Sequence, residues 1–230
     1  MPPTPVVEGS VSVPLDGSSG AEEPQHESVG AASIWRIRAG LVPLFFLSGV
    51  AALVYQICWQ RMLFVAFGVD IESVTIIVST FMFGLGAGAL IGGDLGDRFP
   101  KHRLTMFSII ELTIGVFGIL SPTLIPAVGS IAIRGSLPTI ALVNFLLLLV
   151  PTIMMGATLP ILVAYVVQSY KSVGVSIGLL YFVNTLGAAL GAAGTGLVTF
   201  YFFGLTATIY AAAALNVLVS AVVWRWLRRA

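Results

Sequence analysis

Six long apolar runs constrain the fold of this chain more than any other feature of its sequence. Each is long enough to cross the hydrocarbon core of a bilayer, which takes about 20 apolar residues in a helix. Only 9% of the residues are charged, and ionised groups are costly in hydrocarbon. We therefore predict an all-α integral membrane bundle of six transmembrane helices. The runs lie near residues 41–60, 73–93, 104–125, 137–167, 173–203 and 206–227.

The first 33 residues have a different composition from the rest of the chain. They are rich in proline, serine and glycine, and they hold five of the ten acidic residues. Such a segment buries too little apolar surface to offset the entropy of ordering it. We predict a disordered cytoplasmic tail over 1–33, either an inert linker or a recruitment segment, and a six-helix transmembrane domain over 34–230.

The basic residues predict the orientation of the helices. With the N-terminus inside, nine of the eleven Lys and Arg residues lie on the cytoplasmic side, as the positive-inside rule requires. We therefore expect both termini to be cytoplasmic, in a bacterial inner membrane. The inner basic residues are Arg36, Arg38, Arg98, Lys101, Arg103, Lys171, Arg225, Arg228 and Arg229; the outer ones are Arg61 and Arg134. The aromatic belt expected at the inner interface contains Trp35, Trp224 and Trp226.

A single acidic residue, Glu111, lies about two turns inside the third apolar run. A carboxylate at that depth needs a partner within the bundle. One interpretation is a proton- or cation-coupled site, and the other is a structural hydrogen bond to a neighbouring helix. Amides in or near the spans can form similar bonds between helices, each worth about 1 kcal/mol. These amides are Gln56, Asn144, Asn184 and Asn216.

Glycine spacing predicts where helices pack closely. Gly84, Gly88 and Gly92 are four residues apart, and so are Gly187 and Gly191. This spacing leaves one face of each helix nearly bare, so that another backbone can approach.

Motifs for covalent or cofactor chemistry are missing from the sequence. The glycine-rich segment 84–88 has neither the preceding strand nor the acidic residue that dinucleotide binding requires. Cys58 is the only cysteine, so it forms neither an internal disulfide nor a metal-ligand set, and we expect a buried thiol. We predict no catalytic residue, metal or cofactor, and therefore lean against an enzyme. The sequence lacks a basic face of the kind that binds nucleic acid. The expected partner is the lipid bilayer.

A charged segment between the second and third runs resembles the signature at the same place in transporters of the major facilitator superfamily. The resemblance covers residues 93–104, with Pro100 in place of a glycine. In this position Gly93 would permit close packing, and Asp97 would cap the next element. The basic residues would hold the loop at the cytoplasmic face. The signature residues are Gly93, Asp97, Arg98, Lys101 and Arg103.

A second resemblance covers most of the chain after the tail. Segments 45–61, 151–160 and 180–188 look like helices one, four and five of membrane-bound spermidine-synthase-like proteins, and Glu111 falls where their third helix carries a glutamate. In that family such a bundle precedes a soluble aminopropyltransferase-like domain, which these 230 residues lack. The resemblance implies a membrane module of the family. With it, Glu111, Gln56 and Asn184 become the candidate intramembrane polar site.

Three functions are compatible with these observations. The chain could serve a polyamine-related protein, such as a separately encoded aminopropyltransferase-like protein, as a membrane anchor or transporter-like partner. It could be a half-size transporter of a small solute that works as a homodimer or with a second six-helix half, because six spans are half of the usual twelve. It could also be a truncated fragment of a membrane-bound aminopropyltransferase.

Overall fold

The chain folds into a bundle of long helices. The computed structural model describes residues 25–67, 71–132, 135, 137–170 and 173–228. This part of the chain contains no strand, and six of its helices are long and apolar enough to cross a membrane. The predicted fold class, an all-α integral membrane bundle with six spans, is confirmed.

The helices follow the predicted apolar runs closely. α2 continues five residues beyond the predicted end at Gly93, and α3 continues seven residues beyond the predicted end at residue 125. α1 begins inside the segment 1–33 that we predicted as a tail, and the rest of that segment, residues 1–24, lies outside the described residues. The elements are α1 (Gln25–Phe67), α2 (Ile71–Arg98), η1 (Pro100–His102), α3 (Arg103–Ala132), α4 (Leu137–Tyr170), α5 (Val173–Gly194), η2 (Thr195–Thr199), α6 (Phe200–Phe202) and α7 (Gly204–Leu227).

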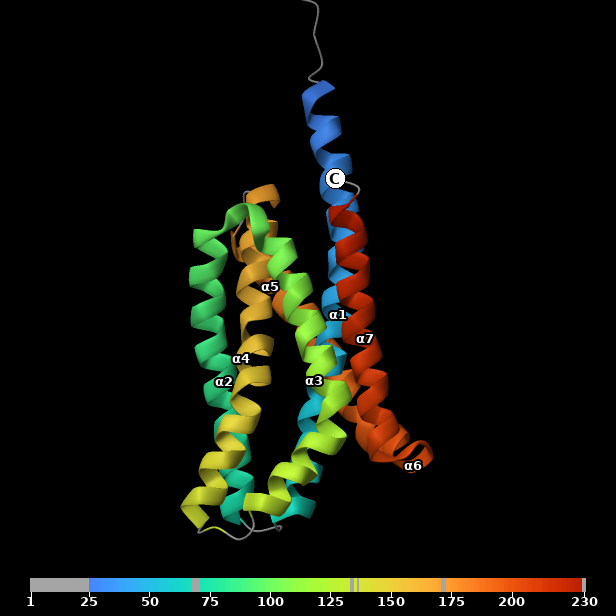
Figure 1. Cartoon of the computed structure of the whole chain (residues 1–230). Helices are drawn as coiled ribbons and strands as arrows, with labels where there is room; N and C mark the ends of the chain where they lie inside the picture. Colours follow the sequence, from blue (N-terminus) through green and yellow to red (C-terminus); the bar gives the residue numbers. More distant parts are fainter. Residues whose placement is uncertain (1–24, 68–70, 133–134, 136, 171–172, 229–230) are drawn as a thin grey trace, which may run out of the picture.

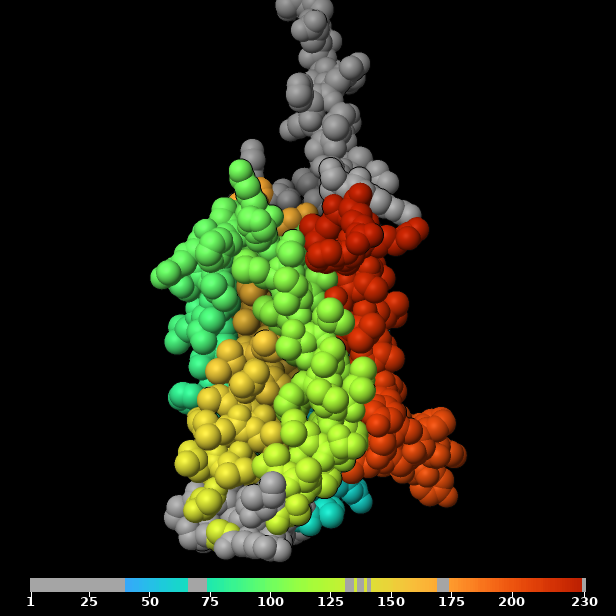
Figure 2. All heavy atoms as spheres, in the orientation of Figure 1, coloured from blue at the N-terminus to red at the C-terminus, as the bar shows by residue number. Residues whose placement is uncertain are grey.

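A glycine separates the last two spans. Gly204 has a φ of 74°, a left-handed conformation that glycine adopts without steric cost. α5 continues into the π-helical turn η2 and into α6, and the chain then reverses into α7. In Figure 2 the orange segment around α6 stands out from the side of the bundle. The break between the spans falls at Phe203, and α7 begins two residues before the predicted start of the last run at residue 206.

Both ends of the described chain lie at one end of the bundle (Figure 1). The connection between α2 and α3 is at this same end, and the connection between α3 and α4 is at the opposite end. The end with the two termini therefore carries Arg98, Lys101, Arg103 and Arg225. Of the other basic residues used for the orientation, Lys171, Arg134 and Arg229 lie outside the described residues.

The helix pairs form an approximate internal repeat. The main pairs are α2 with α4, α5 with α1, and α3 with α7; α3 also packs on α4, and α7 on α1. Exchanging α1, α2 and α3 for α4, α5 and α7 converts α2–α4 into α5–α1 and α3–α4 into α7–α1, and it leaves α3–α7 unchanged. The repeat is approximate, since α1 also packs on α3. Because the three-helix halves start from opposite ends of the bundle (Figure 1), they have inverted topology.

The glycine spacing marks the closest of these contacts. A Cβ atom on Gly84, Gly88 or Gly92 would collide with Thr152, Ile153 or Ala157 of α4, respectively. On α5, a Cβ atom on Gly187 or Gly191 would collide with the α1 backbone at Phe46 or Val50. The predicted close approach is confirmed at all five glycines. We call the two sets the α2 seam (Gly84, Gly88 and Gly92) and the α5 seam (Gly187 and Gly191), and the exchange of the two halves converts one seam into the other.

The core between α1 and α3 is aromatic. Tyr55 and Trp59 are fully buried, and their rings stack with centroids 4.7 Å apart. The Trp59 ring also meets Phe117 of α3 edge-on, with centroids 5.1 Å apart. Cys58 is a free thiol, buried as predicted.

Candidate functional site

Glu111 lies in the middle of the bundle, where α3 meets α1 and α7. Its side chain is completely buried. The Ser48 hydroxyl on α1 donates a hydrogen bond to Glu111 Oε1 at 2.5 Å, and the Asn216 amide on α7 donates one to Oε2 at 2.6 Å. The carboxyl group therefore joins three helices. These are the helix-to-helix bonds that the structural interpretation of Glu111 predicts.

A second polar contact joins α3 and α7 about one helical turn away from Glu111. The Ser220 hydroxyl on α7 donates to the carbonyl oxygen of Ser108 on α3 at 2.8 Å. The two hydroxyl oxygens are 3.0 Å apart. Because α3 and α7 are also bonded about one turn away, Glu111 and Asn216 are held in register.

Glu111 has no cationic partner among the described residues. The ion pairs found there join Arg98 to Asp94 and Arg103 to Asp97, at the end of the bundle. The carboxyl group accepts bonds from neutral donors alone, and a buried charge is costly without a counter-charge. The negative charge of an ionised Glu111 can be neutralised in two ways, by uptake of a proton or by a cation bound nearby.

A cavity of about 120 Å³ lies next to this cluster. Each of the six long helices contributes to its wall, and Ser48 and Asn216 belong both to the wall and to the hydrogen bonds of Glu111. The lining residues are Ser48, Ala52, Leu53, Gln56, Phe81, Leu85, Ile114, Met155, Thr158, Asn184 and Asn216. Residues from both halves of the repeat thus enclose one space.

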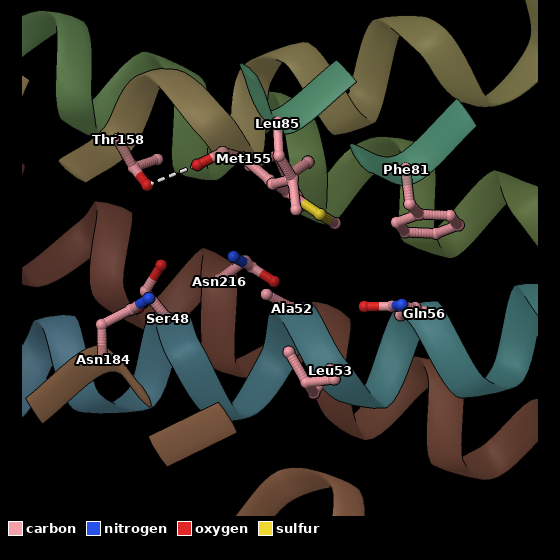
Figure 3. A pocket seen from close by; sticks show the side chains of 11 residues that line it. Ser48, Ala52, Leu53, Gln56, Phe81, Leu85, Met155, Thr158, Asn184 and Asn216 are labelled. Atoms are coloured by element: carbon pink, nitrogen blue, oxygen red, sulfur yellow. Dashed lines mark hydrogen bonds between the residues drawn. The ribbon is translucent and has the colours of Figure 1, made fainter. Parts of the chain in front are cut away.

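Polar and apolar side chains alternate along the wall (Figure 3). Ser48, Asn184 and Thr158 lie at one end of the view, and Phe81 lies toward the other end with Gln56. Asn216 lies between them, where the α1 side chains face those of α2 and α4. The wall therefore offers a ligand both polar and apolar contacts.

The oxygen of the Asn216 amide is an unused acceptor. Asn216 is buried, and its Oδ1 has no hydrogen-bond partner among the described residues. Its Nδ2 donates to Glu111, the orientation that an ionised Glu111 requires because a carboxylate can only accept. The free end of the amide is therefore an oxygen.

The structure brings the three predicted intramembrane residues together. Gln56 and Asn184 line the cavity, and Glu111 lies behind Ser48 and Asn216. Sequence reasoning gave no signal for Thr158, because a membrane-buried threonine commonly bonds to its own helix, as here to Met155 O at 2.7 Å. Ser48 lies in the segment 45–61, but its residue type alone did not distinguish it.

The charged segment at the end of α2 differs from the predicted loop. α2 includes Asp97, and η1 begins after Phe99 without a side-chain cap, so the predicted capping by Asp97 is wrong. Pro100 disfavours helix at the preceding residue, and Phe99 is accordingly non-helical, with φ −123° and ψ 62°. The predicted close packing of Gly93 is also wrong, since a Cβ atom there would meet nothing within 4 Å.

The basic residues of this segment have different environments. Arg103 is buried, and it donates from Nε to the Gly96 carbonyl and from Nη1 to the Ala164 carbonyl, both at 2.7 Å. It thereby ties the start of α3 to both α2 and α4. Arg98 pairs with Asp94 on the surface at 2.9 Å, and Lys101 is exposed in η1.

Comparison of the chain with protein-family models, with curated proteins and with solved structures gives no match. The geometry of the bundle is consequently what indicates a function for this chain. Within the described ranges, no three His, Cys, Asp or Glu side chains are grouped so that they could hold a metal ion. The cavity offers hydroxyl and amide groups beside a carboxyl group, which suits reversible binding.

Proposed function

We propose that this chain is a transporter-like membrane module that binds a small solute in the central cavity beside Glu111. The observation that carries the proposal is that all six long helices line this cavity. In transporters built from inverted repeats, the substrate site lies between the repeats near the bilayer midplane. The cavity has that relation to the two three-helix halves.

A purely anchoring role accounts less well for the centre of the bundle. An anchor requires a lipid-facing surface, and an apolar interior would serve it at lower cost than a buried carboxyl group. Here a carboxyl group, two hydroxyls and three amides surround or adjoin one cavity. The anchor for an aminopropyltransferase-like protein, which the family resemblance implies, is therefore the alternative outcome of the test.

We place both termini on the cytoplasmic side of a bacterial inner membrane. The support is the charge bias of the sequence together with the position of the α2–α3 connection at the end that holds both termini. A complete transport path would need a second six-helix half, and a homodimer is the simplest arrangement that provides one.

Uptake into proteoliposomes tests the proposal. The purified chain should take up at least one member of a panel of radiolabelled small amines, amino acids and sugars, and Glu111→Gln should abolish this uptake. Thr113→Val is the matched control, because Thr113 is a partly buried α3 residue whose hydroxyl is bonded to its own helix at Ile109 O, in an exposed hydrogen bond. Unchanged uptake by Glu111→Gln would refute the role of this residue.

A pull-down from native membranes separates transport from anchoring. If no member of the panel is taken up and a soluble aminopropyltransferase-like protein co-purifies with the chain, the anchor is the correct function. If uptake is measured with the chain alone, the anchor is not needed to explain it.

A further inference from the structure

We infer that the ligand of the central cavity is a small monovalent cation of the alkylammonium class. This inference rests on the proposed function, since it names the kind of solute that the same site takes. It is argued from the charge of the cavity, from its free hydrogen-bonding group, and from its size and wall.

The charge of the site favours a cation. Glu111 accepts bonds from the neutral side chains of Ser48 and Asn216, and no described Lys, Arg or His pairs with it. An anionic ligand would be repelled at short range by an ionised Glu111, whereas one positive charge would balance it. A second positive charge would have no acidic partner among the cavity-lining residues.

The free hydrogen-bonding group requires a donor from the ligand. Because Asn216 Nδ2 is committed to Glu111, the unused atom at the cavity is the acceptor Oδ1. A buried acceptor without a partner costs about 1–3 kcal/mol. An ammonium group carries several N–H donors, so it can satisfy Oδ1 and still has donors for other oxygens of the wall.

The size and the apolar wall limit the rest of the ligand. The volume of about 120 Å³ is slightly below the roughly 150 Å³ of a protein cavity known to hold benzene. An alkyl chain of a few carbons fits beside an ammonium head, whereas long di- and triamines do not. The wall includes the apolar side chains of Phe81, Leu85 and Met155, which would pack against such a chain.

Binding of [¹⁴C]ethylammonium to the purified full chain in detergent tests the inference. We expect saturable binding that unlabelled propylammonium displaces and that acetate, K⁺, spermidine and tetraethylammonium do not. Glu111→Gln and Asn216→Ala should each weaken binding by about tenfold or more, and a tenfold loss corresponds to about 1.4 kcal/mol. The matched control is Asn144→Ala, which removes a buried amide that is outside the cavity wall, and it should bind within about twofold of the wild type.

The outcomes distinguish this inference from the proposed function. If a neutral or anionic solute is taken up and alkylammonium ions neither bind nor compete, the inference is overturned and the proposed function stands. Displacement by K⁺ as effective as by propylammonium would overturn the alkylammonium assignment. If neither binding nor uptake of any solute is found, the proposed function fails as well. Should Glu111→Gln not fold, as judged by its thermal unfolding, the comparison of Asn216→Ala with Asn144→Ala decides the question.

Discussion

At the scale of single residues, the aromatic core contains one satisfied and one unsatisfied polar group. Trp59 Nε1 donates to Ser121 Oγ at 2.9 Å, and the Ser121 hydroxyl donates to the Gly118 carbonyl at 2.8 Å. The Tyr55 hydroxyl, stacked next to Trp59, is buried and has no partner among the described residues. The two neighbouring rings should therefore respond differently to the loss of a polar atom.

Tyr55→Phe should leave the free energy of unfolding unchanged or raise it by up to about 1 kcal/mol, because it removes an unpaired buried hydroxyl. Ser121→Ala should lower it by about 1–3 kcal/mol, since it leaves Trp59 Nε1 without an acceptor. Denaturation in mixed micelles measures both changes. A loss in Tyr55→Phe as large as that in Ser121→Ala would contradict the assignment.

Arg103 and Arg98 provide a similar contrast at the end of the bundle. Arg103→Lys should lower the free energy of unfolding by about 1.5–3 kcal/mol, because lysine lacks the planar fork that reaches two carbonyl oxygens. Arg98→Ala should change it by no more than about 0.5 kcal/mol, since the pair with Asp94 is exposed. Chemical denaturation of the two variants checks this, and equal effects would argue against the buried role of Arg103.

At the scale of elements, the glycine seams determine how closely the helices approach. The α2 seam packs on α4 and the α5 seam packs on α1. Small residues let helix backbones come together in a membrane, where van der Waals packing rather than the hydrophobic effect drives association. α2 also has glycines off the seam, such as Gly86, where a Cβ atom would meet nothing within 4 Å.

Gly88→Ala should lower the free energy of unfolding by about 1–3 kcal/mol, because the new methyl group overpacks the contact with the Ile153 backbone. Gly86→Ala is the matched control on the same helix. It should cause no loss, since there is space for the methyl group and alanine favours helix more than glycine does. Thermal unfolding in detergent compares the two, and similar melting temperatures would rule out the seam as a tight contact.

At the scale of the whole molecule, the order of the six helices brings both described ends of the chain and several basic residues to the same end of the bundle. Both described ends and the α2–α3 connection lie at one end of the bundle (Figure 1). The positive-inside rule supports our proposal that this end faces the cytoplasm. The exposed aromatic residues Tyr201, Phe202 and Phe203 lie at α6, on the side of the bundle toward the opposite end, as in an interfacial aromatic belt.

Cysteine labelling tests this orientation. In a Cys58→Ala background, Gly135→Cys in the α3–α4 connection should react with a membrane-impermeant maleimide in spheroplasts. Lys101→Cys in η1 should react only after permeabilisation. Both positions are exposed in the structure, so unequal access reports on the membrane side. Labelling of Lys101→Cys in intact spheroplasts would invert the proposed topology.

The sequence by itself determined the elements of this protein, because crossing a bilayer imposes a length and an apolar character that can be counted residue by residue. The glycine spacing also identified the faces of α2 and α5 that pack, and the break next to Gly204 followed from a local property of glycine. Two local predictions failed at the end of α2, for Asp97 and Gly93. The charged residues there did not end the helix, and Gly93 lies off the packed face.

Only the tertiary structure decided what surrounds Glu111. Its depth in the third apolar run signalled that it needs a partner, but Ser48 and Asn216 come from helices 63 and 105 residues away along the chain. The cavity likewise exists because six separate helices leave space at one level. Span and spacing are properties of one segment, whereas partners and cavities depend on the relative placement of many segments, which no single run of residues specifies.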